Sequence, residues 1–386
     1  MSNIAVSNTI LEWAAERLGT SLEGLAAAMA SPKRVDNFLS GSLTLTQASE
    51  LAQRLHIPFG YLFLDSPPKD EMPKIPDLRQ TQHPEPLSFA FYEVLEDIEK
   101  KIGWYTAQLN DVEADELPFV GKYRSIVETT PSTVAKDIAA TIGFSDGDRN
   151  ACGDFESLYR LLVSKFEAVR ILVFRSGIAK SNTRRQLAIS EFRGFAVVNK
   201  MSPAIFVNGR DAPAAWIFTL VHEAAHIWLG QSGVSDSTVS NTISAQGVEA
   251  FCNKVAAEFL TPEELFLKLW ERTNDSKIAA LARYFKVSKL VVARRALDFG
   301  LVSREAYLEI HAASIPKKNE DGGGNPYATI PIRSSKRFTE AVINSAMTGE
   351  TMLRDAGRLL NIKPGTVVEL YKRRKYGMTQ GVDRIV

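Results

Sequence analysis

The segment that most constrains this chain is "TLVHEAAHIWLG", residues 219–230, which holds two histidines four residues apart. His222 and His226 occupy positions i and i+4 of a predicted helix, so their imidazoles lie on one face. Two imidazoles at that spacing can bind one Zn2+ ion. Glu223 is about 100° further round the helix, where it can reach the open side of the metal without binding it. The segment therefore predicts a zinc site with Glu223 as general base.

An ordinary amphipathic helix that contains two histidines by chance is the alternative. The other faces of the segment are apolar, with residues such as Trp216, Ile217 and Ile227. A helix of this kind is expected to be buried, and unpartnered polar side chains in it would be costly. An H-E-x-x-H pattern arises by chance in roughly one sequence in a hundred or fewer at this length. The zinc interpretation is therefore favoured.

A catalytic zinc needs a third protein ligand and one open coordination position. The three remaining histidines lie in other parts of the chain, so a carboxylate is expected. The next predicted helix, "VEAFCNKVAAEFLTP" at 248–262, offers Glu249 and Glu258. These two are nine residues apart, which places them about 180° from each other on the helix. They cannot both face one metal, and spacing alone does not choose between them.

Composition limits the class of protein. The chain has 386 residues, enough for two or three domains, and a net charge of +1, which creates no overall attraction to nucleic acid or an anionic membrane. Two cysteines are too few for a disulfide framework. The chain shows neither the apolar segment of a secretory signal nor a run of about 18 apolar residues. We expect a cytoplasmic protein without membrane contact.

The N-terminal part, residues 1–66, is predicted to be a helix-turn-helix-like domain. Residues 8–64 read as short helices, with apolar residues at three- and four-residue spacing and with Ser21, Gly41 and Thr46 as start and stop signals. Any bundle of short helices gives a similar pattern. The domain carries four basic and six acidic residues, a net of −2, where a DNA-binding surface usually has a basic excess. The proline-rich stretch 67–86 is predicted to be a linker.

Residues 87–270 are predicted to form the metal-binding domain, mainly α with a small β-sheet. Helices are expected within 87–143 and at "CGDFESLYRLLVSKF", followed by a strand at "VRILVF" and a β-hairpin over 189–209. Asp211 and Pro213 mark the start of the histidine-containing helix and Gly230 marks its end. We expect "PAIFVN" to be an edge strand that could align a substrate backbone.

Two C-terminal regions are expected beyond the metal-binding domain. Residues 271–314 resemble a second helix-turn-helix, which either completes the helical support of the metal site or contacts nucleic acid or a substrate protein. A Gly-rich linker then leads to a basic module at 326–386. Residues 331–386 contain eleven Lys or Arg and five Asp or Glu, which gives a net charge of +6. The run Lys372, Arg373, Arg374 and Lys375 is either a solvated helix face or a site for nucleic acid or an acidic partner.

The segments "FRGFAVVN…PAIFVNG", "FTLVHEAAHIWLG" and "VEAFCNKVAAEFLTP" together resemble the ImmA/IrrE family of zinc metallopeptidases, as do the helical N-terminal part and the linker. The resemblance spans roughly residues 8–300 and implies a zincin-like core. It further implies that His222, His226 and Glu249 bind Zn2+ and that Glu223 is the catalytic base. The departures are Phe38-Leu39-Ser40 before Gly41 and the linker triplet at 77–79. They leave the peptidase centre intact but argue against DNA binding by the N-terminal domain, for which recognition of a protein partner is the alternative.

The family resemblance also implies a biological role. Members are bacterial or phage regulators that act on a helix-turn-helix repressor, and some long members look like antitoxin components. The predicted function is therefore zinc-dependent cleavage of a specific protein, a repressor or a toxin-associated partner. The alternative is a DNA- or protein-binding transcription regulator or antitoxin whose metal domain serves partner binding. The exchange Glu223→Gln separates them, because only a peptidase loses its output while folding and metal content persist.

Overall fold

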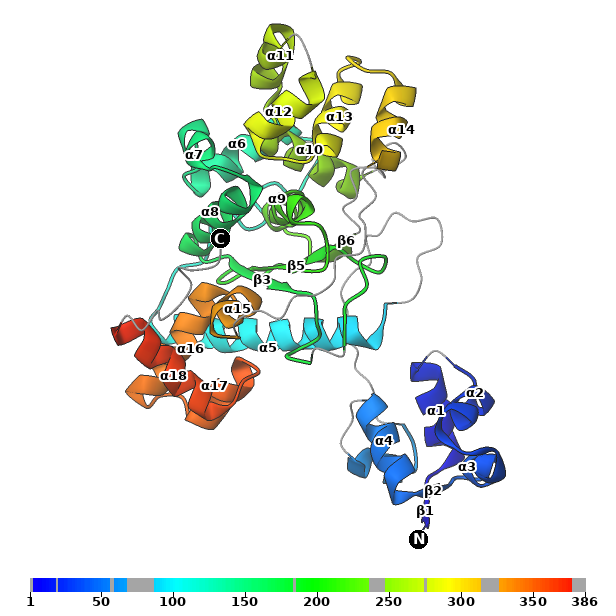
Figure 1. Ribbon diagram of the computed structural model, residues 1–386. Coiled ribbons are helices and arrows are strands. Elements are labelled where there is room, and N and C mark those ends of the chain that lie inside the picture. Colours follow the sequence, from blue (N-terminus) through cyan, green and yellow to red (C-terminus); the bar gives the residue numbers. More distant parts are fainter. Residues whose placement is uncertain are drawn as a thin grey trace. The chain divides into compact units, whose positions relative to one another are not determined.

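The computed structural model describes residues 3–18, 20–55, 59–67, 87–182, 185–235, 247–273, 276–313 and 326–376. The chain divides into two compact units, Met1–Lys74 and Ile75–Val386. Nearly all of the predicted linker and the last ten residues of the predicted basic module lie outside the described residues. The expected fold class is confirmed, because helices dominate and the strands form only small sheets (Figure 1). The boundaries expected at 270, 314 and 326 stay predictions.

The first unit is a bundle of short helices with one small antiparallel sheet. Its elements are β1 (Asn3–Ala5), α1 (Asn8–Arg17), α2 (Leu22–Met29), η1 (Pro32–Arg34), α3 (Val35–Leu39), β2 (Ser42–Thr44), α4 (Leu45–Leu55) and η2 (Phe59–Phe63). The short helices were predicted; the pairing of β1 with β2 was not. Ser21 caps α2, as expected. Helix α4 begins one residue before the expected signal Thr46, because Thr44 and Gln47 exchange hydrogen bonds between side chain and backbone.

The second unit carries the four-stranded sheet and the helices that contain His222, His226 and Glu249. Its helices are α5 (Phe89–Asp111), α6 (Pro131–Thr141), α7 (Asp146–Ala151), α8 (Phe155–Ala168), α9 (Pro213–Leu229), α10 (Val248–Leu260), α11 (Glu263–Arg272), α12 (Lys277–Phe285), α13 (Lys289–Asp298), α14 (Arg304–Ala313), α15 (Pro326–Arg333), α16 (Lys336–Thr348), α17 (Leu353–Leu359) and α18 (Pro364–Tyr376). Its strands are β3 (Leu172–Ser176), β4 (Gly194–Val197), β5 (Ala204–Asn208) and β6 (Gly233–Ser235). None of these helices is both long and apolar enough to cross a membrane.

The four strands are ordered β3-β5-β4-β6. Strand β5 runs parallel to β3, with Leu172 opposite Ala204, and antiparallel to β4, with Gly194 opposite Val207. The hairpin expected over 189–209 is therefore present as β4 and β5. The expectation that "PAIFVN" forms an edge strand is wrong, since β5 has a partner on both sides. Among the described strands the edges are β3 and β6, so an added strand could not pair with β5.

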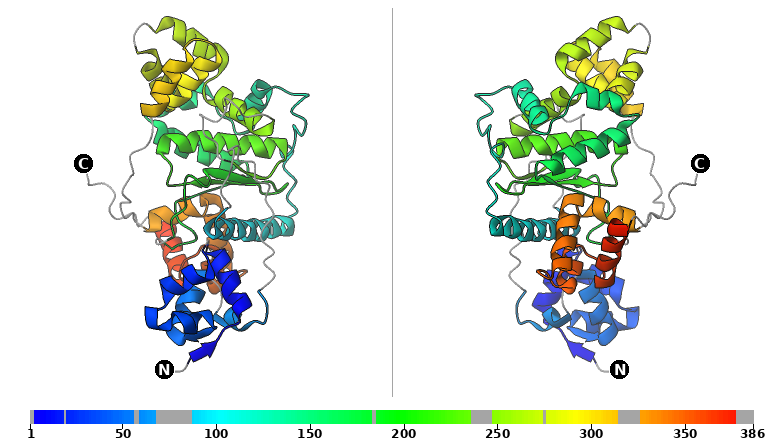
Figure 2. Two further views of the ribbon diagram at one scale, coloured as in Figure 1. Left: turned by 90° about the vertical axis from the view of Figure 1, so that its right-hand side faces the viewer. Right: turned by 90° about the vertical axis from the view of Figure 1, so that its left-hand side faces the viewer.

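Each face of the four-stranded sheet carries a hydrophobic cluster, because successive residues along a strand point to opposite faces. Val173 and Ile205 belong to the cluster that contains α9 and α10, whereas their neighbours Phe174 and Phe206 belong to the cluster that contains α5 and the C-terminal helices. Figure 2 shows the resulting layers, with α9 on one side of the sheet and α5 with α15 and α16 on the other. The strands are buried on both faces, which fits their continuous apolar sequence.

The helices α15 to α18 share a hydrophobic cluster with α5 and the sheet. Phe338 on α16 lies against Trp104 on α5, with ring centroids 5.7 Å apart, and Val367 and Leu370 on α18 join the same cluster. The C-terminal helices thus pack on the sheet face that α9 does not cover.

Glu167 at the end of α8 holds the start of α16. Its carboxylate accepts hydrogen bonds from the Ser335 hydroxyl at 2.6 Å and from the backbone amides of Lys336 at 2.9 Å and Arg337 at 3.3 Å. These amides belong to the first turn of a helix, where backbone donors lack partners within the helix and a negative charge is favourable. Ser335 itself has a φ of 59°, a conformation that costs energy in a non-glycine residue. The Glu167 carboxylate therefore links the strained start of α16 to the end of α8.

Replacing Glu167 by alanine is expected to lower the free energy of unfolding by about 2 kcal/mol, because it leaves two partly buried amides and a buried hydroxyl without acceptors. Denaturant unfolding measures the change, and faster hydrogen exchange at the first turn of α16 locates it. Glu340→Ala, a carboxylate on α16 itself, is the matched control and should change stability by under about 0.5 kcal/mol. Equal losses in both variants would contradict the anchoring role.

Candidate metal centre

Helix α9 is buried over most of its length. It begins at Pro213 after the N-cap Ala212, whose side chain provides no capping bond. The expected start signal Asp211 instead forms a buried ion pair with Arg193 on the segment before β4. Every residue from Ile217 to Leu229 is buried, as the apolar flanks predicted. A buried helix with two histidines and a glutamate requires partners for those polar groups.

Two glycines from different segments meet at the C-terminal end of α9. Gly230 ends the helix with a φ of 70°, as predicted. The amides of Gly121 and Tyr123, in the turn after α5, donate to the carbonyl oxygens of Ile227 and Trp228 at 2.9 Å each. A Cβ on Gly230 would lie 2.9 Å from the Cα of Gly121, so the two backbones approach this closely only because residue 230 lacks a side chain. Backbone hydrogen bonds therefore hold the helix end, together with the stacking of Trp228 on Phe119.

His222, His226 and Glu249 come together between α9 and α10 as a buried group of three ligand atoms. The two Nε2 atoms are 3.1 Å apart, and they lie 3.2 and 3.0 Å from the carboxylate oxygens of Glu249. Ligand atoms bound to a tetrahedral ion at 2.0–2.1 Å are separated by about 3.3 Å. The spacing of the group therefore fits one small metal ion.

The chemistry of these donors also fits a cation. If the imidazoles are neutral with their protons on Nδ1, two Nε2 lone pairs and a carboxylate converge, and a positive ion removes their repulsion. Burial alone would raise the pKa of Glu249, but without a metal ion the charge and hydrogen bonds of protonated imidazoles outweigh it and lower the pKa to about 2. A bound cation acts in the same direction. The carboxylate is therefore ionised at neutral pH. Among the described residues neither Nδ1 atom has a hydrogen-bond partner, so no described side chain fixes the tautomer.

The described residues supply three ligands and no fourth. Cys252 lies one turn after Glu249 and is fully buried. Burial raises the pKa of its thiol, and the negative charges of Glu249 and Glu223 raise it further. The Cys252 sulfur is also not among the ligand atoms that lie within 4.8 Å of one another, which belong to His222, His226 and Glu249. Three ligands with an open position are typical of a catalytic site, whereas structural sites are usually closed by four.

Glu223 lies against strand β4 at its first residue, Gly194. A Cβ at Gly194 would come within 2.9 Å of the Glu223 carboxylate, 2.5 Å of the Thr219 methyl group and 2.9 Å of the Phe206 carbonyl oxygen. The strand backbone can approach α9 only because this residue is glycine. Gly194 was not among the residues predicted from the sequence. An isolated glycine at the start of the strand "GFAV" was the available signal.

Glu258, the alternative third ligand, belongs to a different contact. It pairs with Arg295 on α13, and Arg295 also donates to the carbonyl oxygen of Thr261 just past α10. Arg149 on α7 donates to the carbonyl oxygens of Phe259 and Leu260. Two cations therefore satisfy the carbonyl groups at the C-terminal end of α10, where positive charge is favourable. Residues of 271–314 thus support the helix that carries Glu249.

The predicted basic run lies on α18, in the layer on the other side of the sheet from α9. Lys372, Arg374 and Lys375 are exposed. Arg373 pairs with Glu369 at 3.0 Å, and Arg374 donates to Asn344 at 3.3 Å. Part of the run is therefore bonded within the C-terminal helices, and its role in nucleic-acid or partner binding stays a prediction.

Comparison with known families agrees with this geometry. Residues 166–297 match the Peptidase_M78 family model, described as an IrrE N-terminal-like domain. The match runs from the end of α8 into α13 and includes the whole four-stranded sheet, α9 and α10. It supports an ImmA/IrrE type of domain and a metallopeptidase class. Residues 334–373 match a domain of unknown function, DUF8813. No curated protein matches the chain.

Proposed function

We propose that this protein is a zinc-dependent metallopeptidase that controls gene expression by cutting a specific protein. The observation that carries the proposal is the buried group of His222, His226 and Glu249, within a region that matches a peptidase family model. A group of two imidazoles and one carboxylate is a ligand set typical of catalytic zinc. The family resemblance points to a helix-turn-helix repressor, or a toxin-associated partner, as the substrate.

The residues of the site would have distinct roles in the reaction. His222, His226 and Glu249 would hold the metal, and Zn2+, when bound, would supply a Lewis acid that polarises a carbonyl group and makes water more acidic. The Glu223 carboxylate would accept a proton from the attacking water and then donate it to the leaving amine nitrogen. Burial of these side chains excludes bulk water, which strengthens their electrostatic interactions.

The test is cleavage of the protein encoded by the neighbouring gene. The purified chain with added zinc should produce one discrete cut, and Glu223→Gln should slow it by about 10²–10⁴-fold, because a general base contributes that much. Zinc content and the thermal midpoint of unfolding should stay unchanged in that variant. Glu264→Gln, an exposed carboxylate on α11, is the matched control and should cut at the parent rate.

The alternative function is a regulator or antitoxin whose metal domain binds a partner. It requires Glu223→Gln to retain full regulatory output in cells. A variant that keeps its zinc, its fold and its output would refute the peptidase proposal.

A further inference from the structure

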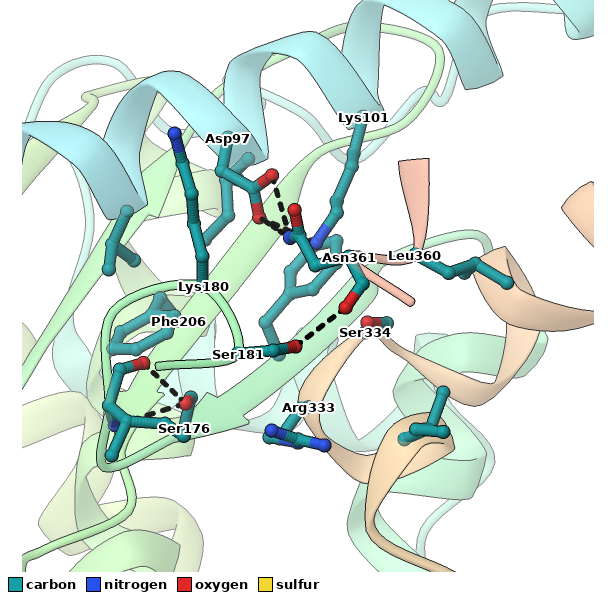
Figure 3. Close-up of a pocket in the computed structure, with 15 residues that line it drawn as sticks. Asp97, Lys101, Ser176, Lys180, Ser181, Phe206, Arg333, Ser334, Leu360 and Asn361 are labelled. Atoms are coloured by element: carbon teal, nitrogen blue, oxygen red, sulfur yellow. Dashed lines mark hydrogen bonds and ion pairs between the residues drawn. The ribbon is translucent and has the colours of Figure 1, made fainter. Parts of the chain in front are cut away.

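A cavity lies on the face of the sheet opposite α9, where three parts of the chain meet. Its walls come from α5, from β3 with the turn that follows, and from the C-terminal helices (Figure 3). The space between its walls is about 410 Å³ including the mouth. A small polar group fits between the walls, and any larger ligand would have to extend through the mouth.

On the wall formed by α5, a positive and a negative side chain already compensate each other. The Lys101 ammonium group lies 2.6 Å from the carboxylate of Asp97, and the Asn361 side-chain amide donates to both oxygens of that carboxylate at 2.9 and 3.0 Å. Asp97 therefore contributes no uncompensated negative charge to the cavity. The Lys101 side chain is only 4% exposed. Its ammonium group has three hydrogens, of which the contact with Asp97 uses one, so donors remain available.

The opposite wall carries a cation without a counter-charge. Arg333, the last residue of α15, is half-buried, and it forms no ion pair or hydrogen bond with another described residue. Burial lowers the pKa of Arg333, and no neighbouring carboxylate offsets that effect. Ser334 beside it is only 4% exposed, and its hydroxyl forms no hydrogen bond with another described residue. In the view of Figure 3, Ser334 lies between Arg333 and Lys101.

We propose that this cavity binds a small tetrahedral oxyanion of the phosphate type. Arg333 would provide the main charge and a forked set of donors that matches phosphate geometry. The Ser334 hydroxyl and the free hydrogens of Lys101 would complete the set. The ligand is either inorganic phosphate or the phosphate group of a small metabolite whose remainder extends through the mouth.

Such a ligand would join two parts of the layer that covers this face of the sheet. Arg333 and Ser334 belong to the start of the C-terminal helices, Lys101 belongs to α5, and Ser181 in the turn after β3 donates to the Asn361 carbonyl oxygen at 2.8 Å. A bound anion would therefore hold the C-terminal helices against α5 and the sheet. The inference does not depend on the peptidase proposal, since none of these residues contacts the metal group.

The test is isothermal titration of the full chain with sodium phosphate at constant ionic strength, repeated with sodium sulfate and with adenosine 5′-monophosphate. We expect one saturable site per chain and a thermal midpoint that rises with phosphate concentration. Arg333→Gln should weaken phosphate binding by at least about ten-fold, because a hydrogen bond to a charged group is lost. Ser334→Ala should weaken it less, and Arg354→Gln, an exposed arginine on α17, should leave it unchanged.

Binding of phosphate and of the monoester would identify a phosphate-bearing metabolite as the ligand class, and binding of phosphate and sulfate without the monoester would identify the free ion. Two results would overturn the proposal. One is the absence of saturable phosphate binding to the folded parent. The other is equal phosphate affinity in the parent, Arg333→Gln and Arg354→Gln, which would mean that the ion binds elsewhere. Near-identical circular dichroism spectra of the three proteins verify folding.

Discussion

The exchange Glu249→Gln is expected to abolish stoichiometric zinc binding, whereas Glu258→Gln should leave one zinc per chain. Glu249 lies 3.0–3.2 Å from the Nε2 atoms of His222 and His226, and its carboxylate is ionised because its pKa is held at about 2. A neutral amide in its place supplies no negative charge, so affinity should fall by more than about 100-fold. Elemental analysis and competition with a zinc chelator measure the change.

Glu258 provides the matched control because it lies on the same helix and has a structural contact instead. Its neutralisation leaves Arg295 without its carboxylate partner, which should lower the free energy of unfolding by about 3 kcal/mol. A chelator should lower the thermal midpoint of the parent and of Glu258→Gln, and leave that of Glu249→Gln unchanged, because only the first two bind metal. Loss of zinc from folded Glu258→Gln, with zinc retained by Glu249→Gln, would reverse the assignment.

Glu249 and Glu258 show which features of the metal site can be predicted from the sequence and which cannot. Helical periodicity placed His222 and His226 on one face, because the i, i+4 relation is local to one element. The same periodicity showed only that Glu249 and Glu258 face opposite directions. Which of them faces the histidines depends on how α10 packs against α9, and that packing involves residues far apart in the chain. Family resemblance had favoured Glu249, and the structure brings it to the histidines.

The four-stranded sheet could likewise be predicted only in part from the sequence. The β-branched and aromatic residues of "FAVV" and "AIFVN" indicated strands and a hairpin, since neighbouring strands of a hairpin are joined by a short turn. The parallel pairing of β3 with β5 was not visible in the sequence, and for that reason β5 was wrongly expected at an edge. The hydrophobic cluster that joins α5 with α15 to α18 was equally hidden, because more than 200 residues separate Trp104 from Phe338.

Gly194→Ala is expected to slow cleavage by at least about ten-fold while the chain keeps its zinc. The new Cβ would lie 2.5 Å from the Thr219 methyl group and 2.9 Å from both the Glu223 carboxylate and the Phe206 carbonyl oxygen. Strand β5 holds that carbonyl in place, so the two side chains on α9 must move instead. Overpacking of this kind costs about 1–3 kcal/mol, and a displaced general base loses part of its contribution of 10²–10⁴.

Two further variants separate a displaced base from general loss of stability. Gly103→Ala lies on α5, where a Cβ would meet nothing within 4 Å, and it should keep the parent cleavage rate with equal or slightly higher stability. The double variant Gly194→Ala/Thr219→Ser removes the methyl contact and retains the clash with Glu223. It should therefore recover part of the lost stability without recovering the cleavage rate. A parent-like rate in Gly194→Ala, or a rate that recovers together with stability in the double variant, would show that the contact between β4 and Glu223 does not position the base.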